Sequence, residues 1–258
     1  MISRLLLRRS VAHGPLALVY HAIDTPRDVS NSPWSLPSRV FAAHLRMLRD
    51  EGYTGHTIDT LPAGQSGRHV AITFDDGYRN NLAAADALEA AGFPGSFFIV
   101  SGNLGDAPRW HDADGPRDTI MDASALRELA ARGFEIGSHG TRHERLTHLP
   151  DAAIQTSLET SRHELAAIIG QPVVSLAYPY GDWNANVIAC AERAGYRNAC
   201  TTQSGWALRD GNRLRIRRLS VMREDTPARL ARKLAIAANA VDWGTLWRSR
   251  ILAHGAKP

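Results

Sequence analysis

Apolar runs and amphipathic segments alternate along the chain. Short runs of consecutive apolar residues, bounded by Gly, Pro or polar residues, are typical of strands buried on both faces. Such runs predict strands at residues 15–21, 69–75, 95–101, 134–139, 173–178, 197–202 and 214–221. Between them, apolar residues recur at helical spacing, often with a capping residue before and Gly after. These stretches predict helices at residues 37–52, 80–92, 122–133, 151–169, 184–194 and 226–240.

This alternation predicts an α/β fold with a mostly parallel sheet and helices outside it. The most polar motifs follow the ends of predicted strands, as active-site residues do in barrels. Because neither an internal repeat nor an interdomain linker is visible, we expect one catalytic domain over residues 1–258. Its core would cover about residues 15–225, followed by a helical tail at 226–258.

Composition limits the function classes. The chain has 258 residues, 44% of them hydrophobic and 22% charged, with a net charge of +4 carried mainly by arginine. These charges are scattered, and the run Arg213–Arg218 alternates with Leu214 and Ile216, so we expect no nucleic-acid partner. We also expect no transmembrane segment, because no apolar run approaches about 20 residues. The apolar stretch in Met1–Arg9 is too short for a signal peptide, which favours the cytoplasm.

Two polar motifs carry the candidate chemistry. Asp75 and Asp76 follow the apolar run His69–Phe74, and His139 and His143 follow another predicted strand. One carboxylate and two imidazoles leave coordination positions open, which is typical of catalytic zinc sites. Zn²⁺ is therefore the first choice of metal, with Co²⁺, Ni²⁺ or Fe²⁺ also compatible. The alternative interpretation is a hydrogen-bonded polar network without a metal.

These motifs resemble those of a known family. The segments TFDDGY at 73–78, IGSHGTRHERL at 136–146 and LAYPYG at 176–181 resemble, in order and interval, the polysaccharide deacetylase family. This family comprises the NodB-homology enzymes of carbohydrate esterase family 4. The resemblance covers about residues 15–225 and implies a distorted (β/α) barrel with about seven strands. The YPYG loop and an N-terminal V-x-Y-H further resemble the biofilm-type N-deacetylases.

The resemblance also implies roles. Asp75 would be the general base, and Asp76, His139 and His143 the metal ligands. The backbone N–H of Tyr180 would help to hold the developing oxyanion. For Asp75 the alternative is a turn-capping carboxylate.

The remaining candidates would contact the substrate. Pro179 and Gly181 flank Tyr180 in a loop that would meet the substrate, and Trp110 in the long 102–121 loop could line a groove. For the loop around Tyr180, the alternative is a plain Pro-Tyr-Gly turn.

The chain departs from the common family pattern at two places. Ala177 stands where the family usually has an arginine that orients the general base. Arg218 is our candidate replacement, and strand alternation predicts that only one of Arg217 and Arg218 points inward. The general acid would be His21, at the end of a predicted strand, with His254 near the C-terminus as the alternative.

The sequence therefore predicts a metal-dependent amide hydrolase, and the resemblance implies that it removes acetyl groups from N-acetylated amino sugars. The substrate would be a polysaccharide, oligosaccharide or glycolipid of the N-acetylglucosamine type. Two alternatives stay open: hydrolysis of another acyl or amide substrate on the same scaffold, and a glycan-binding protein that has lost catalysis. The sequence leaves open the oligomeric state and whether Cys190 and Cys200 form a disulfide.

Overall fold

The structure is a computed structural model in which residues 2–9, 14–24, 32–64, 67–110 and 118–241 are described. These residues include ten short strands. They are β1 (Leu16–Tyr20), β2 (Ala22–Asp24), β3 (Ser35–Pro37), β4 (Thr54–His56), β5 (His69–Phe74), β6 (Ser96–Ile99), β7 (Glu135–Ser138), β8 (Ser175–Ala177), β9 (Asn198–Cys200) and β10 (Leu219–Ser220).

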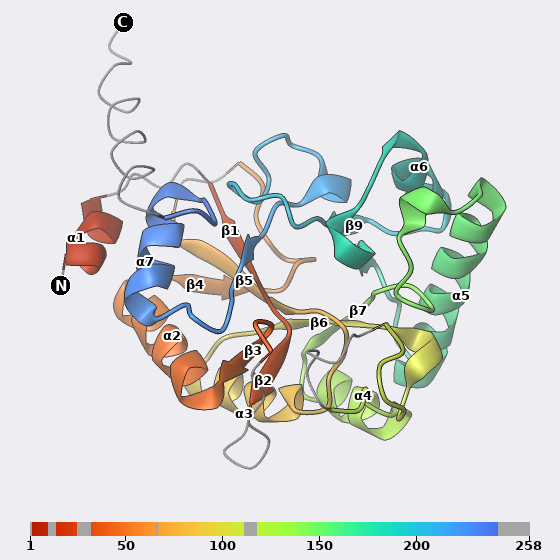
Figure 1. Cartoon of the computed structure of the whole chain (residues 1–258), viewed down its shortest axis with the longest axis horizontal. Coiled ribbons are helices and arrows are strands. Elements are labelled where there is room, and N and C mark those ends of the chain that lie inside the picture. The colour runs from red at the N-terminus through yellow and green to blue at the C-terminus, as the bar shows by residue number, and fades with distance from the viewer. Residues whose placement is uncertain (1, 10–13, 25–31, 65–66, 111–117, 242–258) are drawn as a thin grey trace, which may run out of the picture.

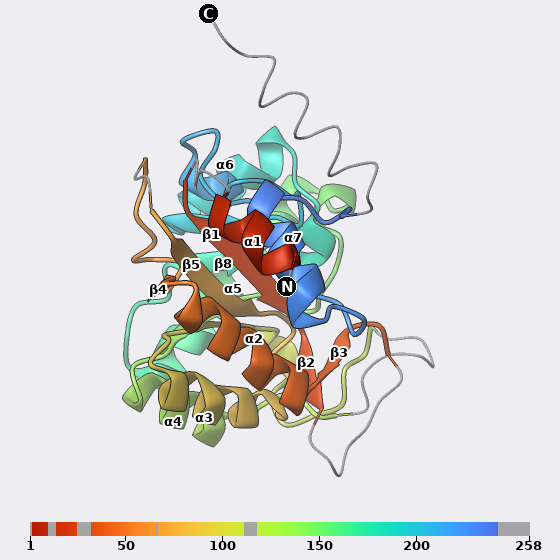
Figure 2. The same cartoon turned by 90° about the vertical axis from the view of Figure 1, so that its left-hand side faces the viewer.

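In the described part of the chain, seven α-helices pack around these strands. They are α1 (Ile2–Arg9), α2 (Ser38–Asp50), α3 (Asn81–Ala91), α4 (Ala123–Ala131), α5 (Asp151–Ile169), α6 (Ala185–Arg193) and α7 (Pro227–Ile236). Figure 1 shows α2 and α7 on one side of the strands, α3 and α4 below them, and α5 and α6 on the other side. Figure 2 shows that α1 lies against α7.

The main sheet is parallel and curled. Its strand order is β10-β1-β5-β6-β7-β8-β9, and β4 pairs with the first half of β5. An isolated parallel bridge between Cys200 and Ile216 connects the last strand to the segment that leads into β10. The two edges of the sheet therefore approach each other, and the strands form the distorted (β/α) barrel that the sequence predicts.

The barrel has a small interior and a larger outer core. Its interior is filled by one large ring, Phe98, among small or medium residues that include Ala17, Ala71, Ala177 and Cys200. The opposite faces of the same strands pack against the helices in one extended apolar cluster. This alternation of faces explains why the strands are apolar throughout, since both of their faces are buried.

The predicted strand at 214–221 is only partly correct. Arg213–Arg215 forms a 3₁₀ turn whose start is capped by the side chain of Asn212, and only Leu219–Ser220 is a strand. The segment must cross from β9 to β1, so it cannot follow a single neighbour as an ordinary strand does. The strands β2, β3 and β4 were not predicted, because three residues are too few to show a period.

Three further expectations concern the whole chain. No helix among the described residues is both long and apolar enough to cross a bilayer. Cys190 and Cys200 are both buried free thiols. The C-terminal helix ends at Ile236, and residues 242–258 lie outside the described residues, so the single-domain boundaries and the helical tail stay predictions.

Candidate active site

The two adjacent carboxylates lie where β5 ends. Asp75 continues the pairing with β1, because its N–H donates to the carbonyl of Tyr20 at 3.0 Å. The chain then turns sharply, with φ of 72° at Asp76 and 85° at Gly77. A left-handed conformation costs a non-glycine residue about 1 kcal/mol or more, and such strain gathers at functional sites. Both carboxylates are only 3% exposed, so each needs a compensating partner.

Arg218 is the partner of Asp75. Its guanidinium is fully buried and donates two hydrogen bonds to the carboxylate, at 2.7 and 2.6 Å. It also donates to Thr73 Oγ1 at 3.0 Å and, through Nε, to the carbonyl of Thr201 at 3.0 Å. Burial alone would raise the pKa of Asp75, but the guanidinium outweighs it and lowers that pKa below its ordinary value. Asp75 is therefore ionised and fixed in orientation.

The neighbouring Arg217 has a different position. Its guanidinium pairs with Asp210 at 2.9 Å on a partly exposed surface. Alternation along this segment thus turns Arg218 into the barrel and Arg217 away from it.

Asp76 meets two histidines from the loop after β7. Its Oδ1 atom lies 3.5 Å from Nε2 of His139 and 3.3 Å from Nε2 of His143. Burial would raise the pKa of Asp76, yet the two imidazoles bring it well below its ordinary value. Nδ1 of His139 donates to the carbonyl of Ala177 at 2.7 Å, which leaves the lone pair of a neutral ring on Nε2. His143 has φ of 55°, a second strained residue of the site.

This triplet fits a divalent metal. The potential ligand atoms of Asp76, His139 and His143 all lie within 4.8 Å of one another, and all three residues are buried. Two ligands bound to one tetrahedral metal at about 2.0–2.1 Å are separated by about 3.4 Å, close to the spacing around Asp76. Fixing a histidine by its second nitrogen is also typical of metal sites. The three residues therefore constitute a potential metal site.

The loop after β8 forms another wall. Tyr180 has φ of 59°, and its ring lies 4.5 Å from the ring of His143. Gly181 has φ of 71°, and a Cβ there would lie 2.6 Å from the backbone nitrogen of Thr202, so only glycine fits. Gly181 lines the pocket described below. Pro179 is buried and is not among the lining residues, so its contact with a substrate stays a prediction.

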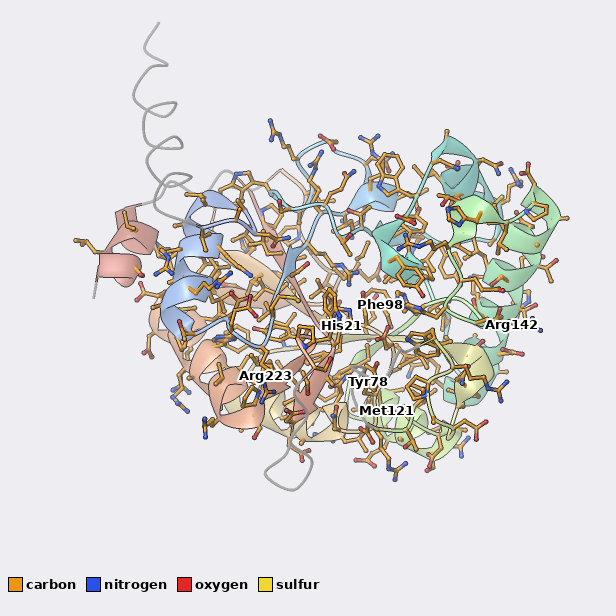
Figure 3. The ribbon with its side chains drawn as sticks, viewed as in Figure 1. His21, Tyr78, Phe98, Met121, Arg142 and Arg223 are labelled. Atoms are coloured by element: carbon orange, nitrogen blue, oxygen red, sulfur yellow. The ribbon has the colours of Figure 1, made fainter. Side chains whose placement is uncertain are left out.

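His21 lies at the end of β1. This strand is flanked by β10, which follows Arg218, and by β5, which precedes Asp75. Figure 3 shows His21 near the centre of the molecule. Its Nδ1 atom is buried and has no hydrogen-bond partner among the described residues. Burial lowers the pKa of His21, although Asp76 and Asp75 oppose this shift. The alternative acid, His254, lies outside the described residues.

A pocket of about 410 Å³ connects these groups. It brings together residues that lie far apart in the sequence, namely His21, Trp34, Asp75, Asp76, Trp110, His139, His143, Arg145, Tyr180, Gly181, Thr202 and Ser220. The ring of Trp110 stacks on that of His143 at 4.8 Å, with 24° between the planes. Sequence reasoning missed four lining residues, Trp34, Arg145, Thr202 and Ser220. An arginine two residues after His143 was a usable signal, whereas the other three depend on tertiary contacts.

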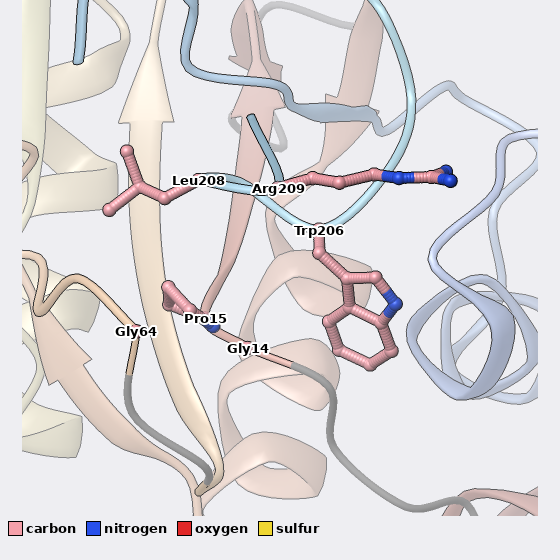
Figure 4. Close-up of a pocket in the computed structure, with 6 residues that line it drawn as sticks. All are labelled: Gly14, Pro15, Gly64, Trp206, Leu208 and Arg209. Atoms are coloured by element: carbon pink, nitrogen blue, oxygen red, sulfur yellow. The ribbon is translucent and has the colours of Figure 1, made fainter. Parts of the chain in front are cut away.

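A second pocket lies at the amino end of β1, the opposite end of the strand from His21. It has a volume of about 510 Å³ and is lined by Gly14, Pro15, Gly64, Trp206, Leu208 and Arg209 (Figure 4). Among the described residues, those that line it include no carboxylate, imidazole or thiol. These lining residues therefore offer no group for acid–base or metal chemistry, in contrast to those of the first pocket.

Comparisons with known proteins give the same family. The family model described as polysaccharide deacetylase matches residues 63–199, more than half of the chain. YxkH of Bacillus subtilis is 28% identical over 211 residues, which are 79% of this chain and 70% of that protein. A chitooligosaccharide deacetylase of Rhizobium leguminosarum bv. trifolii is 27% identical over 137 residues, 52% of this chain and 57% of the relative.

A solved structure shows the same fold. A polysaccharide deacetylase from Bacillus cereus superposes with a TM-score of 0.72 at 23% identity, covering 86% of this chain and 69% of the other. Four of the pocket residues, His21, Trp34, Thr202 and Ser220, lie outside the segment matched by the family model, and so does Arg218, the partner of Asp75.

Proposed function

This chain belongs to the polysaccharide deacetylase family, hydrolases of acetyl amide bonds, and from that premise we propose a specific activity. It is a metal-dependent N-deacetylase that removes acetyl groups from N-acetylated amino sugars of the N-acetylglucosamine type. The observation that carries the proposal is a single pocket lined by Asp75, which is paired with the buried Arg218 behind it, and by the Asp76–His139–His143 cluster.

The metal ligands are Asp76, His139 and His143. When bound there, a divalent metal, with Zn²⁺ as the first choice, would polarise the acetamide carbonyl and lower the pKa of water toward about 7. The imidazole and carboxylate donors also suit Co²⁺, Ni²⁺ or Fe²⁺. Nε2 of His139, which carries the lone pair, stays directed at the site because Nδ1 is held by its hydrogen bond to the carbonyl of Ala177.

The other residues divide the proton transfers between them. Asp75 is ionised and held by Arg218, so it accepts a proton from the attacking water. The backbone N–H of Tyr180 donates to the oxygen that develops negative charge. His21 gives a proton to the sugar nitrogen as the C–N bond breaks. The products are acetate and a free amino sugar.

Acetate release tests this proposal. N-acetylglucosamine oligomers would be incubated with metal-loaded wild type, Asp75→Asn, His21→Ala and, as a matched control, His163→Ala on the exposed face of α5. We expect Asp75→Asn and His21→Ala each to lower the rate of acetate release by a factor of about 10²–10⁴ while metal stays bound. The rate of the control variant should equal that of wild type.

Two results would contradict the proposal. Acetate release only from O-acetylated glycans or other acyl substrates would move the activity to another bond on the same scaffold. Tight glycan binding without release from any acyl substrate would favour a binding protein that has lost catalysis.

A further inference from the structure

Two exposed aromatic rings stand in the wall of the pocket. Among the described residues, Trp34 and Tyr180 are large apolar side chains that are 40% and 42% exposed, and both line the pocket. A tryptophan buries up to about 250 Å² when it packs fully, so leaving one exposed forgoes stabilisation. An exposed aromatic ring at a pocket rimmed by polar groups therefore indicates a ligand contact.

The other two aromatic side chains of the pocket, Trp110 and Tyr180, each have a neighbour packed against the ring. Trp110 stacks on His143. The guanidinium of Arg145 lies 4.2 Å above the ring of Tyr180, which also contacts His143. Trp34 instead contacts the ring of His21 at 4.7 Å in a tilted arrangement, with 52° between the planes. A tilted contact through one part of the ring is compatible with its 40% exposure.

The backbone around Trp34 is held firmly. The carbonyl of Trp34 accepts from the N–H of Ala22 at 3.1 Å, and its own N–H donates to Ser32 Oγ at 3.3 Å. The carbonyl of Pro33 accepts from the N–H of Arg223 at 2.9 Å. The pairing of β2 with β3 continues directly after Trp34, and the side chain of Arg223 donates to this pair as well (Figure 3). The ring is thus presented by a fixed element, which is typical of residues that position a ligand.

The chemistry of deacetylation places the sugar on this side of the pocket. When the amide bond breaks, the acetyl group stays with the attacking oxygen and the nitrogen stays on the sugar. His21 protonates that nitrogen in the proposed function, so the sugar ring must lie near His21. Trp34 is the aromatic ring in contact with His21.

We infer that Trp34 is a substrate-binding residue whose exposed face packs against the apolar C–H face of the sugar that bears the acetamide. The inference rests on the proposed function, which sets the side on which the sugar lies. Trp34 lies outside the segment matched by the family model, at residues 63–199, so the contact comes from this chain's own β2–β3 region. The contact would favour pyranose substrates over small acyl compounds that have no sugar ring.

Two measurements on the metal-loaded protein test the contact. In the first, an N-acetylglucosamine tetramer is titrated calorimetrically into Asp75→Asn, which binds without turnover, and into the same variant with Trp34→Phe or Trp34→Ala. Trp206→Ala, at the opposite end of the barrel, is the matched control. We expect Trp34→Ala to weaken binding about 10-fold, Trp34→Phe to recover most of it, and the control to change nothing.

The second measurement separates a sugar contact from structural support of His21. With Asp75 intact, acetate release from the tetramer is compared with hydrolysis of 4-nitrophenyl acetate, which has no sugar. We expect Trp34→Ala to raise KM for the tetramer with little change in kcat, and to leave 4-nitrophenyl acetate hydrolysis unchanged. A loss of kcat for the tetramer with KM unchanged would instead indicate structural support of His21, because 4-nitrophenolate leaves without a proton and would not report it. That result, an equal loss on both substrates, or unchanged binding of the tetramer overturns the inference.

The two proposals fail in distinguishable ways. If wild type releases no acetate but binds the tetramer in a manner that depends on Trp34, the deacetylase proposal fails and the sugar contact stands. If wild type releases acetate but Trp34→Ala matches it in KM, the sugar contact fails alone. If the tetramer is not bound at all, the contact with Trp34 is overturned as well.

Discussion

Both ends of the barrel contain carboxylate side chains, but the groups that pair with these carboxylates differ between the two ends. At the amino end, Glu135 accepts from the hydroxyl groups of Ser96 and Ser175 and from the backbone N–H of Ile58. At the carboxyl end, Asp75 is paired with an ionised arginine and Asp76 with two titratable imidazoles. These donors to Glu135 are all neutral, whereas the partners of Asp75 and Asp76 are charged or able to become charged.

Two arginines five residues apart repeat this difference. Arg213, near the amino end, donates to the carbonyl groups of Ile58 and Leu61 and to the side chain of Asn198. Arg218 donates to the carboxylate of Asp75. Glu135 and Arg213 at the amino end thus hold neighbouring loops in place through hydrogen bonds to protein groups. The carboxyl end also contains the strained residues Asp76, His143 and Tyr180, and strain together with clustered charge is typical of a site built for chemistry.

Removing the charge of Arg218 should have the largest effect on stability. In Arg218→Met, Asp75 is left buried without its partner, so we expect the free energy of unfolding to fall by about 3–5 kcal/mol. Urea denaturation measures the loss. Arg217→Met is the matched control, because Arg217 pairs with Asp210 at the surface and should cost at most about 1 kcal/mol. Equal losses in the two variants would show that the buried pair is no more important than a surface pair.

A buried histidine outside the candidate active site, His44, should make the stability of the protein depend on pH. His44 of α2 donates from Nε2 to the carbonyl of Asp225 and accepts at Nδ1 from the hydroxyl of Tyr20. Burial lowers its pKa from 6.5 to about 4. Between these values the unfolded chain binds a proton that the native protein excludes, so stability falls as the pH falls.

The loss should be about 1.4 kcal/mol per pH unit and about 3 kcal/mol in total, present below pH 4 and absent above about pH 6.5. The free energy of unfolding of wild type and His44→Gln, measured by urea denaturation from pH 4 to pH 7.5, checks it. The difference between the two proteins should move in favour of the variant as the pH falls. A difference that does not change with pH would contradict a neutral His44.

Substituting Asp76, the carboxylate that we propose as a metal ligand, tests the carboxyl end for function. Asp76→Asn keeps the size of the side chain but removes a ligand charge, so metal affinity should fall by more than about 100-fold. The free energy of unfolding of the metal-free protein should change by less than about 1 kcal/mol, since a buried charge is lost along with its contacts. Metal content after dialysis and urea denaturation measure the two quantities. Unchanged metal affinity would exclude Asp76 as a ligand.

The matching substitution at the amino end should have the smallest effect. Glu135→Gln weakens hydrogen bonds to a charged acceptor, so we expect a loss of about 1–2 kcal/mol in the free energy of unfolding. The rate of acetate release per folded molecule should not change, because this carboxylate lies at the other end of the strands. Glu128→Gln, at an exposed position on α4, is the control. A loss of activity without unfolding would show that the two ends are coupled.

The placement of the central site could be predicted because strand ends are readable. Apolar runs before Asp75 and His139 identify two strands, and the carboxyl ends of parallel strands share one edge of a sheet. Alternation likewise limited the inward arginine to one of Arg217 and Arg218, although most of the predicted strand around them is irregular. Their chemical roles come from the resemblance and are not contained in the periodicity.

The pocket wall could not be predicted in the same way. Trp34 is carried by the short β2–β3 pair, whose two strands of three residues show no period. Its place beside His21 depends on hydrogen bonds that join residues 33–35 to Ala22 and Arg223, which come from separate segments. Thr202 and Ser220 likewise join the pocket through barrel closure. Sequence pattern identifies chemistry at strand ends, whereas the shape that selects a substrate arises from tertiary contacts.

The central claim is that the carboxyl end of the barrel is a single-metal centre for acetamide hydrolysis. The most direct test is to add Zn²⁺ or Co²⁺ in steps to metal-free protein and to measure acetate release from an N-acetylglucosamine tetramer at each step. We predict no release without metal, a linear rise, and a plateau at one metal ion per chain. Acetate release at full rate from the metal-free protein, or no release with one metal ion firmly bound, would contradict the account.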